Sequence, residues 1–346
     1  DEKVLSFCSD NEAPVAPQIL EALLEANSGF ARSYGEDDLT SQLTGVFSEL
    51  FECDVEVFPV TTGTAANALA LGHITPPYGA IYCTPQAHIL VDECGAPGFF
   101  SGGASIVSVD SIHGKIDADY LQNLLKNWGA HGDHEPRPST LSITQTTEVG
   151  TLYKIQEITR ISELLKGHDM LLHMDGARFA NAVASLGCSP ADATWRAGVD
   201  VLSFGATKNG GMAAGAVVFF RKESAIEFGR QRMRGGHLLS KMRYVSAQLL
   251  AYLDSGLWLE LASHANASAR YLRDGLAQLP GVHIAYEVEG NAVFACLPVE
   301  MLEGLISEGF LFHRWPGESG LVRLMCSYSH QKEDIDTFIG AARLLA

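Results

Sequence analysis

The residue with the greatest chemical promise in this sequence is Lys208, which stands between two apolar runs. Residues 199–204 and 215–220 have the composition of buried strands, and the break between them is rich in Gly and Ala. A lysine held between interior strands loses hydration, which lowers the pKa of its ammonium group and makes a neutral amine available. That amine can attack a carbonyl and form a Schiff base. A solvated loop position is the ordinary alternative for a lysine, but the small residues around Lys208 leave room for a flat ligand.

A carboxylate follows another apolar strand. Asp175 lies in the stretch HMDGAR, residues 173–178, directly after the apolar residues 170–172. At such a strand end a carboxylate can keep a heteroaromatic nitrogen protonated, which turns a pyridine ring into an electron sink. The alternative is a helix N-cap for the residues from Ala177 onward. Because one helix and one strand separate Asp175 from Lys208, we expect both at adjacent sheet positions that face one crevice.

A Gly/Thr turn at residues 61–64 joins a strand-like run to an Ala-rich helix. The free backbone N–H groups and the positive dipole end of such a helix suit a phosphate. A plain N-cap by Thr62 or Thr64 is the alternative for this turn. Together with Lys208 and Asp175, the turn fits pyridoxal phosphate (PLP), because each group of the cofactor would bind at a different strand end.

The elements that must position these residues alternate between strand-like and helical stretches in the first part of the chain. This order predicts an α/β fold, with a parallel or mixed sheet covered by helices on both faces. The remainder begins with a long helical stretch broken near Gly256 and continues with strands and two helices. We therefore expect a large domain over residues 12–246 and a small α+β domain over residues 247–346, with segment 1–11 packed near the small domain.

The composition is that of a globular protein with an acidic surface. Of 346 residues, 47% are hydrophobic and 19% charged, and the formal net charge is -17. That charge disfavours binding to nucleic acid or to anionic membranes, and no apolar run approaches the roughly 18 residues of a membrane span. The seven cysteines are odd in number, scattered and without CxxC spacing. They predict neither disulfides nor a metal site, and they favour a cytoplasmic location.

Five motifs occur along the chain: Cys8-Ser9-Asp10, YGED at 34–37, GTAAN at 63–67, HMDGAR at 173–178 and TKNG at 207–210. Together they resemble the low-specificity L-threonine aldolases of the β-eliminating lyase group, and the resemblance runs over nearly the whole chain. It implies PLP fold type I, the aspartate-aminotransferase-like fold, with a mostly parallel seven-stranded sheet in the large domain. It also implies retro-aldol cleavage of L-threonine, L-allo-threonine and related β-hydroxy-α-amino acids, such as phenylserine, to glycine and an aldehyde.

The resemblance also implies roles for single residues. Lys208 would hold PLP as a Schiff base, Asp175 would face the pyridine nitrogen, and His88 would stack on the ring. The phosphate and the substrate carboxylate would each be held by a small set of residues: Gly63 and Thr64 for the phosphate, and Ser9, Arg178 and Arg323 for the carboxylate, with Arg178 also lining the cofactor. Bidentate guanidinium contacts would fix the amino acid so that the bond to be broken stands perpendicular to the π system.

Two histidines are candidates for the base that removes the β-hydroxyl proton. The ordinary pKa of histidine suits His88 and His134 to work at neutral pH, and His134 matches a second family histidine near the substrate hydroxyl. We favour His134, because a ring stacked on the cofactor is less free to reach the hydroxyl. The alternatives are a solvated loop histidine at position 134 and a hydrogen-bonded core histidine at position 88.

The family's phosphate site also draws cations from a neighbouring subunit, which implies a homo-oligomer of dimers that share active sites, assembled into a tetramer. Arg232, Lys241 and Arg243 lie in the matching basic stretch, and the sequence does not choose among them. One departure from the family is Thr144–Thr147, where several relatives have Glu-Asn-Thr-His, which puts the contacts of that imidazole in question.

Two other functions remain open from the sequence. The first is another reaction of a fold-type-I PLP enzyme, either β-elimination or transamination. The second is a non-catalytic PLP-fold binding protein, whose expected signature is the loss of the reactive lysine. The presence of Lys208 argues against the second.

Overall fold

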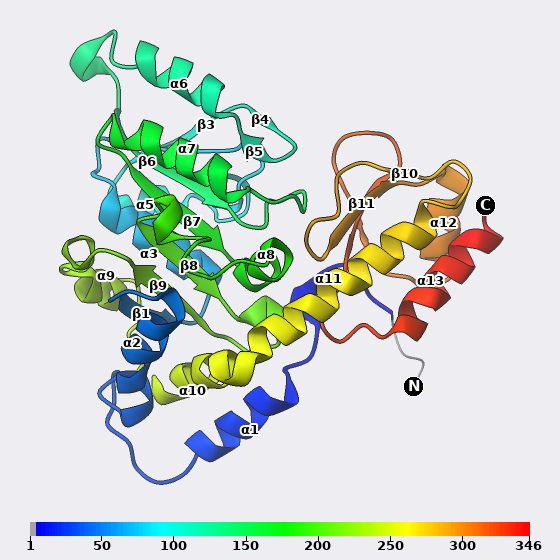
Figure 1. Cartoon of the computed structure of the whole chain (residues 1–346), viewed down its shortest axis with the longest axis horizontal. Helices are drawn as coiled ribbons and strands as arrows, with labels where there is room; N and C mark the ends of the chain where they lie inside the picture. The colour runs from blue at the N-terminus through cyan, green and yellow to red at the C-terminus, as the bar shows by residue number, and fades with distance from the viewer. Residues whose placement is uncertain (1–4) are drawn as a thin grey trace.

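The structure is a computed structural model that describes residues 5–346 (Figure 1). Its largest feature is a seven-stranded sheet in which β9 runs antiparallel to both of its neighbours and the other neighbouring pairs are parallel. The predicted α/β fold with a mostly parallel seven-stranded sheet is therefore confirmed. Across the sheet the strands are β1 (Glu56–Val60), β9 (Gly215–Phe219), β8 (Val201–Gly205), β7 (Leu171–Gly176), β6 (Arg137–Thr144), β2 (Gly79–Cys83) and β3 (Ser105–Ser108).

Helices cover both faces of this sheet. One face packs on α3 (Gly63–Ile74), in which every residue from Ala65 to Leu71 is buried, and on α9 (Phe228–Arg234). The opposite face packs on five helices, namely α2 (Asp38–Phe51), α6 (Ala118–Asn127), α7 (Ile155–Lys166), α8 (Phe179–Leu186) and α10 (Arg243–Leu253). Because helices close both faces, whole strands such as β2 and β9 are buried and read as continuous apolar runs.

Strand register decides which side chains face α3. Successive side chains of a strand alternate between the two faces, so His173 and Asp175 of β7 share one face. Their partners on β8 are Val201 and Ser203, and Val201 packs in the core cluster that contains α3. The two β7 side chains therefore point toward α3.

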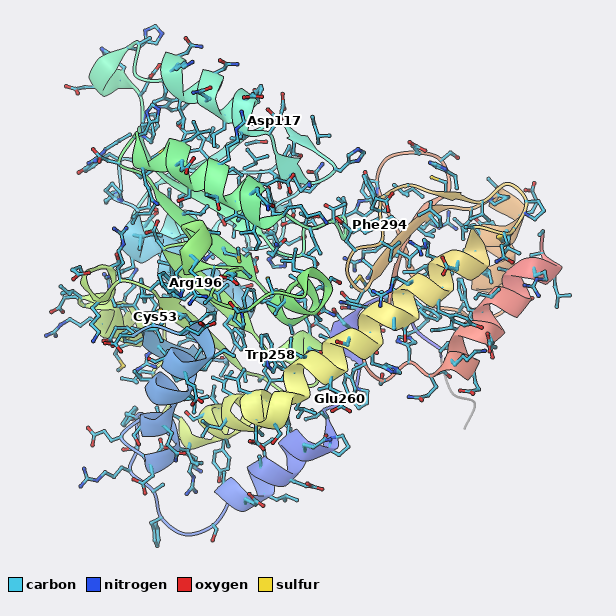
Figure 2. The ribbon with its side chains drawn as sticks, viewed as in Figure 1. Cys53, Asp117, Arg196, Trp258, Glu260 and Phe294 are labelled. Carbon is cyan, nitrogen blue, oxygen red and sulfur yellow. The ribbon has the colours of Figure 1, made fainter. Side chains whose placement is uncertain are left out.

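A four-stranded antiparallel sheet occupies the C-terminal part of the chain, with β11 and β13 at its centre. Helix α11 (Leu257–Leu276) runs from the large sheet to this small one (Figure 1). Figure 2 shows Trp258 near the start of α11, where it packs in the large core, and Phe294 in the small sheet. The remaining elements of this part are β10 (His283–Ile284), β11 (Ala292–Cys296), α12 (Val299–Ser307), β12 (His313–Arg314), β13 (Leu321–Met325) and α13 (Lys332–Leu344).

The helix break predicted at Gly256 is present, as a 3-10 turn over Asp254–Gly256 between α10 and α11. The domain boundary predicted after residue 246 falls inside α10, and the division into two domains stays a prediction. Of the N-terminal segment, Phe7 is buried in the core of the small sheet and exchanges backbone hydrogen bonds with Leu311 and Met325. Residues 1–4 of that segment lie outside the described residues.

Shorter elements complete the fold: α1 (Pro17–Ala26), α4 (His88–Val91), α5 (Ala96–Ser101), β4 (Ser111–Ile112) and β5 (Lys115–Ile116). Between residues 5 and 346, no helix has the length and apolar character that crossing a membrane requires. The same residues contain no group of three or more His, Cys, Asp or Glu side chains that could hold a metal ion.

Candidate active site

Lys208 lies in a 3-10 turn, Thr207–Asn209, that directly follows β8. Asn209 anchors the turn, because its Nδ2 donates to the Tyr252 hydroxyl at 2.8 Å and to the Trp258 carbonyl at 2.9 Å. The Nζ of Lys208 makes no hydrogen bond or ion pair with any residue that the structure describes. Burial and the charge of Arg178 lower the pKa of Lys208, so its neutral amine is accessible.

Asp175 is 4% exposed at the end of β7, and both of its oxygens are held. Oδ2 accepts a hydrogen bond from Asn67 Nδ2 at 2.9 Å, and Oδ1 accepts one from the backbone N–H of Ala177 at 3.0 Å. Helix α8 begins only at Phe179, so Asp175 is not its N-cap. Asp175 pairs with Ser203 of the parallel strand β8, and Lys208 follows the end of β8, so the two residues lie at the same end of the sheet.

The turn before α3 has the free groups that a phosphate needs. Thr62 is the N-cap, with its Oγ1 accepting from the Ala65 N–H at 3.1 Å, and this leaves the N–H groups of Gly63 and Thr64 without partners among residues 5–346. A Cβ added at Gly63 would meet nothing within 4 Å, so the space beside this turn is open. The turn therefore offers donors and room at the positive end of a helix.

Arg232 supplies a half-buried positive charge near the same turn. Its Nη1 donates to the carbonyl of Pro59, two residues before the turn, at 3.2 Å. Its Nε is buried without a hydrogen-bond partner in the described chain, and burial lowers the pKa of the guanidinium to about 10. A buried cation with an unsatisfied donor is costly unless an anion binds beside it. Together with the Gly63 turn, Arg232 fits a phosphate group.

Two guanidinium groups flank the segment that contains Ser9. Arg178 forms a bidentate pair with the buried Asp10, with Nε at 2.7 Å from Oδ2 and Nη2 at 2.8 Å from Oδ1. Arg323 donates from Nη2 to the Cys8 carbonyl at 3.0 Å, and its Nε is buried and unpartnered within residues 5–346. Burial and the charge of Arg178 lower the pKa of Arg323. The chain thus brings the three predicted carboxylate ligands together, with Arg323 the less satisfied of the two arginines.

His88 begins α4 and points one ring nitrogen at a carboxylate that the sequence did not single out. Its Nδ1 lies 2.7 Å from Oε1 of Glu93, and the same oxygen accepts from Asn67 Nδ2 at 2.9 Å. This hydrogen bond raises the pKa of His88. Glu93 has no motif of its own, and its only sequence signal is its place five residues after His88.

A second missed carboxyl group, Glu148, directly follows Thr144–Thr147, where several relatives have Glu-Asn-Thr-His. Its Oε1 accepts from the Thr144 hydroxyl at 2.5 Å and from the His88 backbone N–H at 3.3 Å. Its Oε2 is buried without a partner among the described residues, and burial raises the pKa of Glu148 to about 7. The side chain that contacts the His88 backbone here is therefore a carboxyl group.

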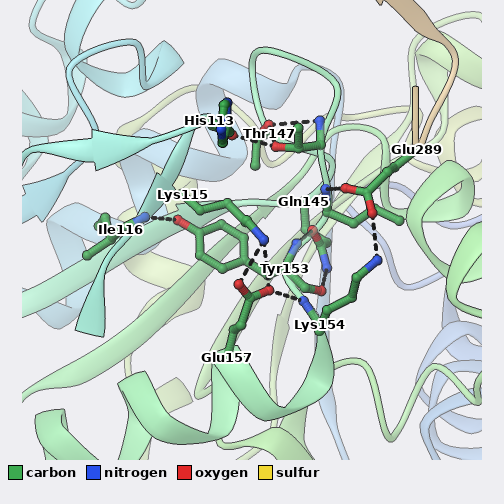
Figure 3. Close-up of polar contacts among 11 residues, drawn as sticks. His113, Lys115, Ile116, Gln145, Thr147, Tyr153, Lys154, Glu157 and Glu289 are labelled. Atoms are coloured by element: carbon green, nitrogen blue, oxygen red, sulfur yellow. Dashed lines mark hydrogen bonds and ion pairs between the residues drawn. The ribbon is translucent and has the colours of Figure 1, made fainter. Parts of the chain in front are cut away.

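The loop that carries Glu148 is pinned from several sides (Figure 3). The side-chain amide of Gln145 donates to the Tyr153 carbonyl at 2.9 Å and accepts from the Tyr153 N–H at 3.0 Å. The hydroxyl of Tyr153 accepts from the Ile116 N–H at 2.8 Å, and Thr147 bonds Thr151 at 2.7 Å. These bonds fix residues 145–153 as one unit, which holds the Glu148 backbone in place.

His134 does not lie with these residues. It ends the 3-10 turn Gly132–His134, which precedes β6, whereas the site forms where β6 ends at Thr144. Eight residues of strand at about 3.3 Å each separate the two ends of β6. Within one chain His134 is therefore not brought to the other site residues, because the loop before a strand and the loop after it lie at opposite edges of the sheet. Its role as the base stays a prediction.

Lys241 and Arg243 are not brought to the Gly63 turn within the chain either. Lys241 is exposed, and Arg243 donates from Nη1 to the Gly29 carbonyl at 3.1 Å. Of the three basic residues proposed from the sequence, Arg232 alone has a hydrogen bond near the turn among residues 5–346. A contribution of the other two across a subunit interface stays a prediction.

His173 is buried beneath the site between two serine hydroxyls, with Nδ1 at 2.8 Å from Ser142 Oγ and Nε2 at 2.9 Å from Ser203 Oγ. Burial lowers its pKa to about 4, against 6.5 for the unfolded chain. Between these values the unfolded state binds a proton that the folded state does not, so stability falls as pH falls. We expect this group to cost roughly 3 kcal/mol of unfolding free energy between pH 6.5 and pH 4.

Urea unfolding of the protein and of His173→Gln at several pH values measures this effect. Gln keeps a donor and an acceptor but does not titrate, so the free-energy gap between the two proteins should narrow as pH falls. A gap that stays constant over this range would show that His173 is not held neutral.

The fold and this site define the class of protein. The β-eliminating lyase family model matches residues 6–298, and the chain belongs to this family. Among curated relatives, it is 41% identical to the low-specificity L-threonine aldolase of Pseudomonas aeruginosa, over 98% of this chain and 97% of the relative. It is 42% identical to the enzyme of the same name from a Pseudomonas species, over 94% and 93%. Among solved structures, the threonine aldolase of Leishmania major has a TM-score of 0.91 at 28% identity, with 99% of each chain covered.

Proposed function

We propose that this protein is a PLP-dependent aldehyde-lyase that cleaves L-threonine, L-allo-threonine and related β-hydroxy-α-amino acids, such as phenylserine, to glycine and an aldehyde. The observation that carries this proposal is the unpaired amine of Lys208, half-buried near the fixed carboxylate of Asp175. The identity to low-specificity L-threonine aldolases over nearly the whole chain supports the same activity.

Different residues of the site would bind different groups of the cofactor. Lys208 Nζ would bond the aldehyde carbon of PLP, Asp175 would face the pyridine nitrogen, and His88 would lie against the ring. Gly63, Thr64 and Arg232 would bind the phosphate, with Arg178 beside the cofactor. When bound, PLP supplies a ring that accepts the electron pair released from the substrate Cα–Cβ bond.

The substrate is held and deprotonated by other groups of this chain. Arg323, Arg178 and Ser9 would bind its carboxylate, which turns the Cα–Cβ bond into the orientation that favours its cleavage. His88 is then the base for the β-hydroxyl proton, because its Nδ1 is occupied by Glu93 and its Nε2 is free among the described residues. Loss of that proton releases the aldehyde, and a proton added at Cα gives glycine.

A product assay tests this function against its alternatives. Incubation of the PLP-loaded protein with L-threonine should give glycine and acetaldehyde in equal amounts. A transaminase would instead give a 2-oxo acid and the amine form of the cofactor, and a β-eliminating reaction would give ammonia and 2-oxobutyrate. Either of these product sets, or no turnover, would contradict the proposal. Separate assays with threo and erythro substrates give the preference at Cβ.

Arg323 is expected to act mainly on substrate binding. Removal of a charge-assisted hydrogen bond costs about 2 kcal/mol, so Arg323→Ala should raise KM roughly 30-fold with a smaller change in kcat. Arg323→Lys is the matched variant, because it keeps the charge and loses the planar fork. Steady-state kinetics with L-threonine measures both constants. An unchanged KM in Arg323→Ala would remove Arg323 from the substrate site.

We also propose that the protein is a cytoplasmic homo-oligomer, built from dimers that share active sites and assembled into a tetramer. In support, the segment from α1 to residue 36 exposes Leu24 and Phe30, and the Arg243 guanidinium binds the Gly29 carbonyl beside them. All seven cysteines are free, as a reducing compartment favours. Light scattering should give four times the chain mass of 37.2 kDa, and a monomer would contradict the shared site.

A further inference from the structure

We propose that Glu93 is a positioning residue that fixes the protonation of the His88 ring, with hydrogen on Nδ1 and the free lone pair of Nε2 offered to the substrate. We propose further that Asn67 ties this carboxylate to Asp175. The inference rests on the proposed function only in taking His88 as the base. Its structural content concerns the hydrogen bonds among four side chains, Glu93, His88, Asn67 and Asp175.

The contact between Glu93 and His88 joins a fully buried side chain to a partly exposed one. The Glu93 side chain is 0% exposed and the His88 side chain is 44% exposed, and the two atoms Oε1 and Nδ1 are 2.7 Å apart. An ionised carboxylate only accepts hydrogen bonds, so the hydrogen between them belongs to Nδ1. The other ring nitrogen, Nε2, makes no hydrogen bond with any described residue. The ring thus presents its acceptor atom to the open side.

Asn67 is oriented by the two carboxylates that it joins. Its Nδ2 lies 2.9 Å from Glu93 Oε1 and 2.9 Å from Asp175 Oδ2, so each of its two hydrogens meets one acceptor. The reverse orientation would place the amide oxygen against two negative groups. Asn67 lies on α3, one turn after Gly63. One helix therefore links the phosphate turn, the pyridine carboxylate and the base.

Four charged or titratable groups act on His88, from four elements or loops. The hydrogen bond to Glu93 raises the pKa of the ring most strongly, Asp175 raises it further, and Lys208 lowers it. Glu148 accepts the His88 backbone N–H, not a ring hydrogen. Burial raises the pKa of Glu93, and the hydrogen bonds from His88 and Asn67 lower it in part. A histidine paired in this way is a stronger base at Nε2 than an isolated one.

Histidine-ring NMR on the full-length PLP-loaded protein, without substrate, tests the inference. The protein is labelled with ¹⁵N and ¹³C in histidine, and the His88 signals are identified by their absence from His88→Gln. In the wild-type protein, neutral His88 should carry its hydrogen on Nδ1. A neutral ring with hydrogen on Nε2 would overturn the proposal without any variant of Glu93.

Glu93→Gln provides the second arm. Loss of the negative charge should lower the pKa of His88 by about 1, and the side-chain amide can donate to Nδ1, which moves the ring hydrogen to Nε2. The acidic limb of the kcat/KM profile should move to lower pH by the same amount. Asp92→Asn is the control, since it removes the same charge from the neighbouring exposed residue and should leave the tautomer unchanged.

The outcomes separate this inference from the proposed function. If Glu93→Gln leaves both the pKa and the tautomer of His88 unchanged, Glu93 does not control the ring and the inference fails. If the NMR results are as expected but threonine yields no glycine, the proposed function fails and the inference about the ring stands. Glu93→Asp retains the charge on a shorter side chain and should keep the wild-type tautomer.

Discussion

The Lys208→Ala protein should retain its fold but lose the visible absorbance of bound PLP, together with aldol cleavage. The amine of Lys208, which has no partner among residues 5–346, is the nucleophile that we propose for the cofactor, and alanine has no atom that can take its place. We expect a loss of activity of about three orders of magnitude or more. Absorbance spectra and glycine production measure the two effects.

Lys222→Ala is the matched control for that experiment. Lys222 is exposed and pairs with Asp54 at 3.3 Å, away from the residues of the site. Its variant should keep both the spectrum and the activity. A Lys208→Ala protein that stays yellow and still forms glycine would show that another amine holds the cofactor.

Asp175→Asn should lower kcat by about two to three orders of magnitude while the protein still folds. Asparagine has the same size and can still accept the Ala177 N–H, but it carries no charge to keep a pyridine nitrogen protonated. Its NH₂ group also faces the Nδ2 of Asn67, which donates in the native protein. Kinetics with L-threonine measures the loss of kcat, and the dissociation constant of PLP measures the change in cofactor binding.

Asp175→Glu separates the charge of this residue from its position. It keeps the carboxylate and displaces it by one methylene, so its activity should lie between those of the native protein and Asp175→Asn. If Asp175→Asn retained the native kcat, a carboxylate opposite the ring would play no part in the reaction.

The sequence was sufficient for the residues that directly follow apolar strands. The positions of Lys208 and Asp175 could be predicted because a buried strand is a largely apolar run and these two ionisable residues lie at or just after the ends of such runs. The Gly63 turn could be recognised for the same reason, and the helix break at Gly256 was visible as a glycine in a long helical stretch. In each case, a signal within a few residues decides the structure.

The rest of the site depends on contacts between distant parts of the chain. Asn67 bonds Asp175, which is 108 residues away in the sequence, and Glu93, which is 26 residues away. No local sequence pattern predicts either contact. Asp10 and Arg178 are 168 residues apart. Charged residues such as Glu93 are ordinarily exposed, so a buried one is visible only when the fold supplies its partners.

His134 shows that a resemblance can assign a role to a residue that one chain places away from the other site residues. It precedes β6, which begins at Arg137 and runs to Thr144. His134 lies three residues before this strand, at the edge of the sheet opposite Thr144. The sequence marks a histidine in a loop but does not say which edge of the sheet that loop serves, and the family resemblance supplied a role that one chain alone does not support.

Reduction of the PLP-loaded protein with sodium borohydride, followed by peptide mapping, tests the central claim most directly. Borohydride makes the bond between a lysine and the cofactor permanent, so the modified peptide identifies the amine. We predict a single modified peptide containing Lys208, and none after prior incubation with excess L-threonine, whose amine displaces that of Lys208. Modification at any other lysine, or no modification, would contradict the assignment.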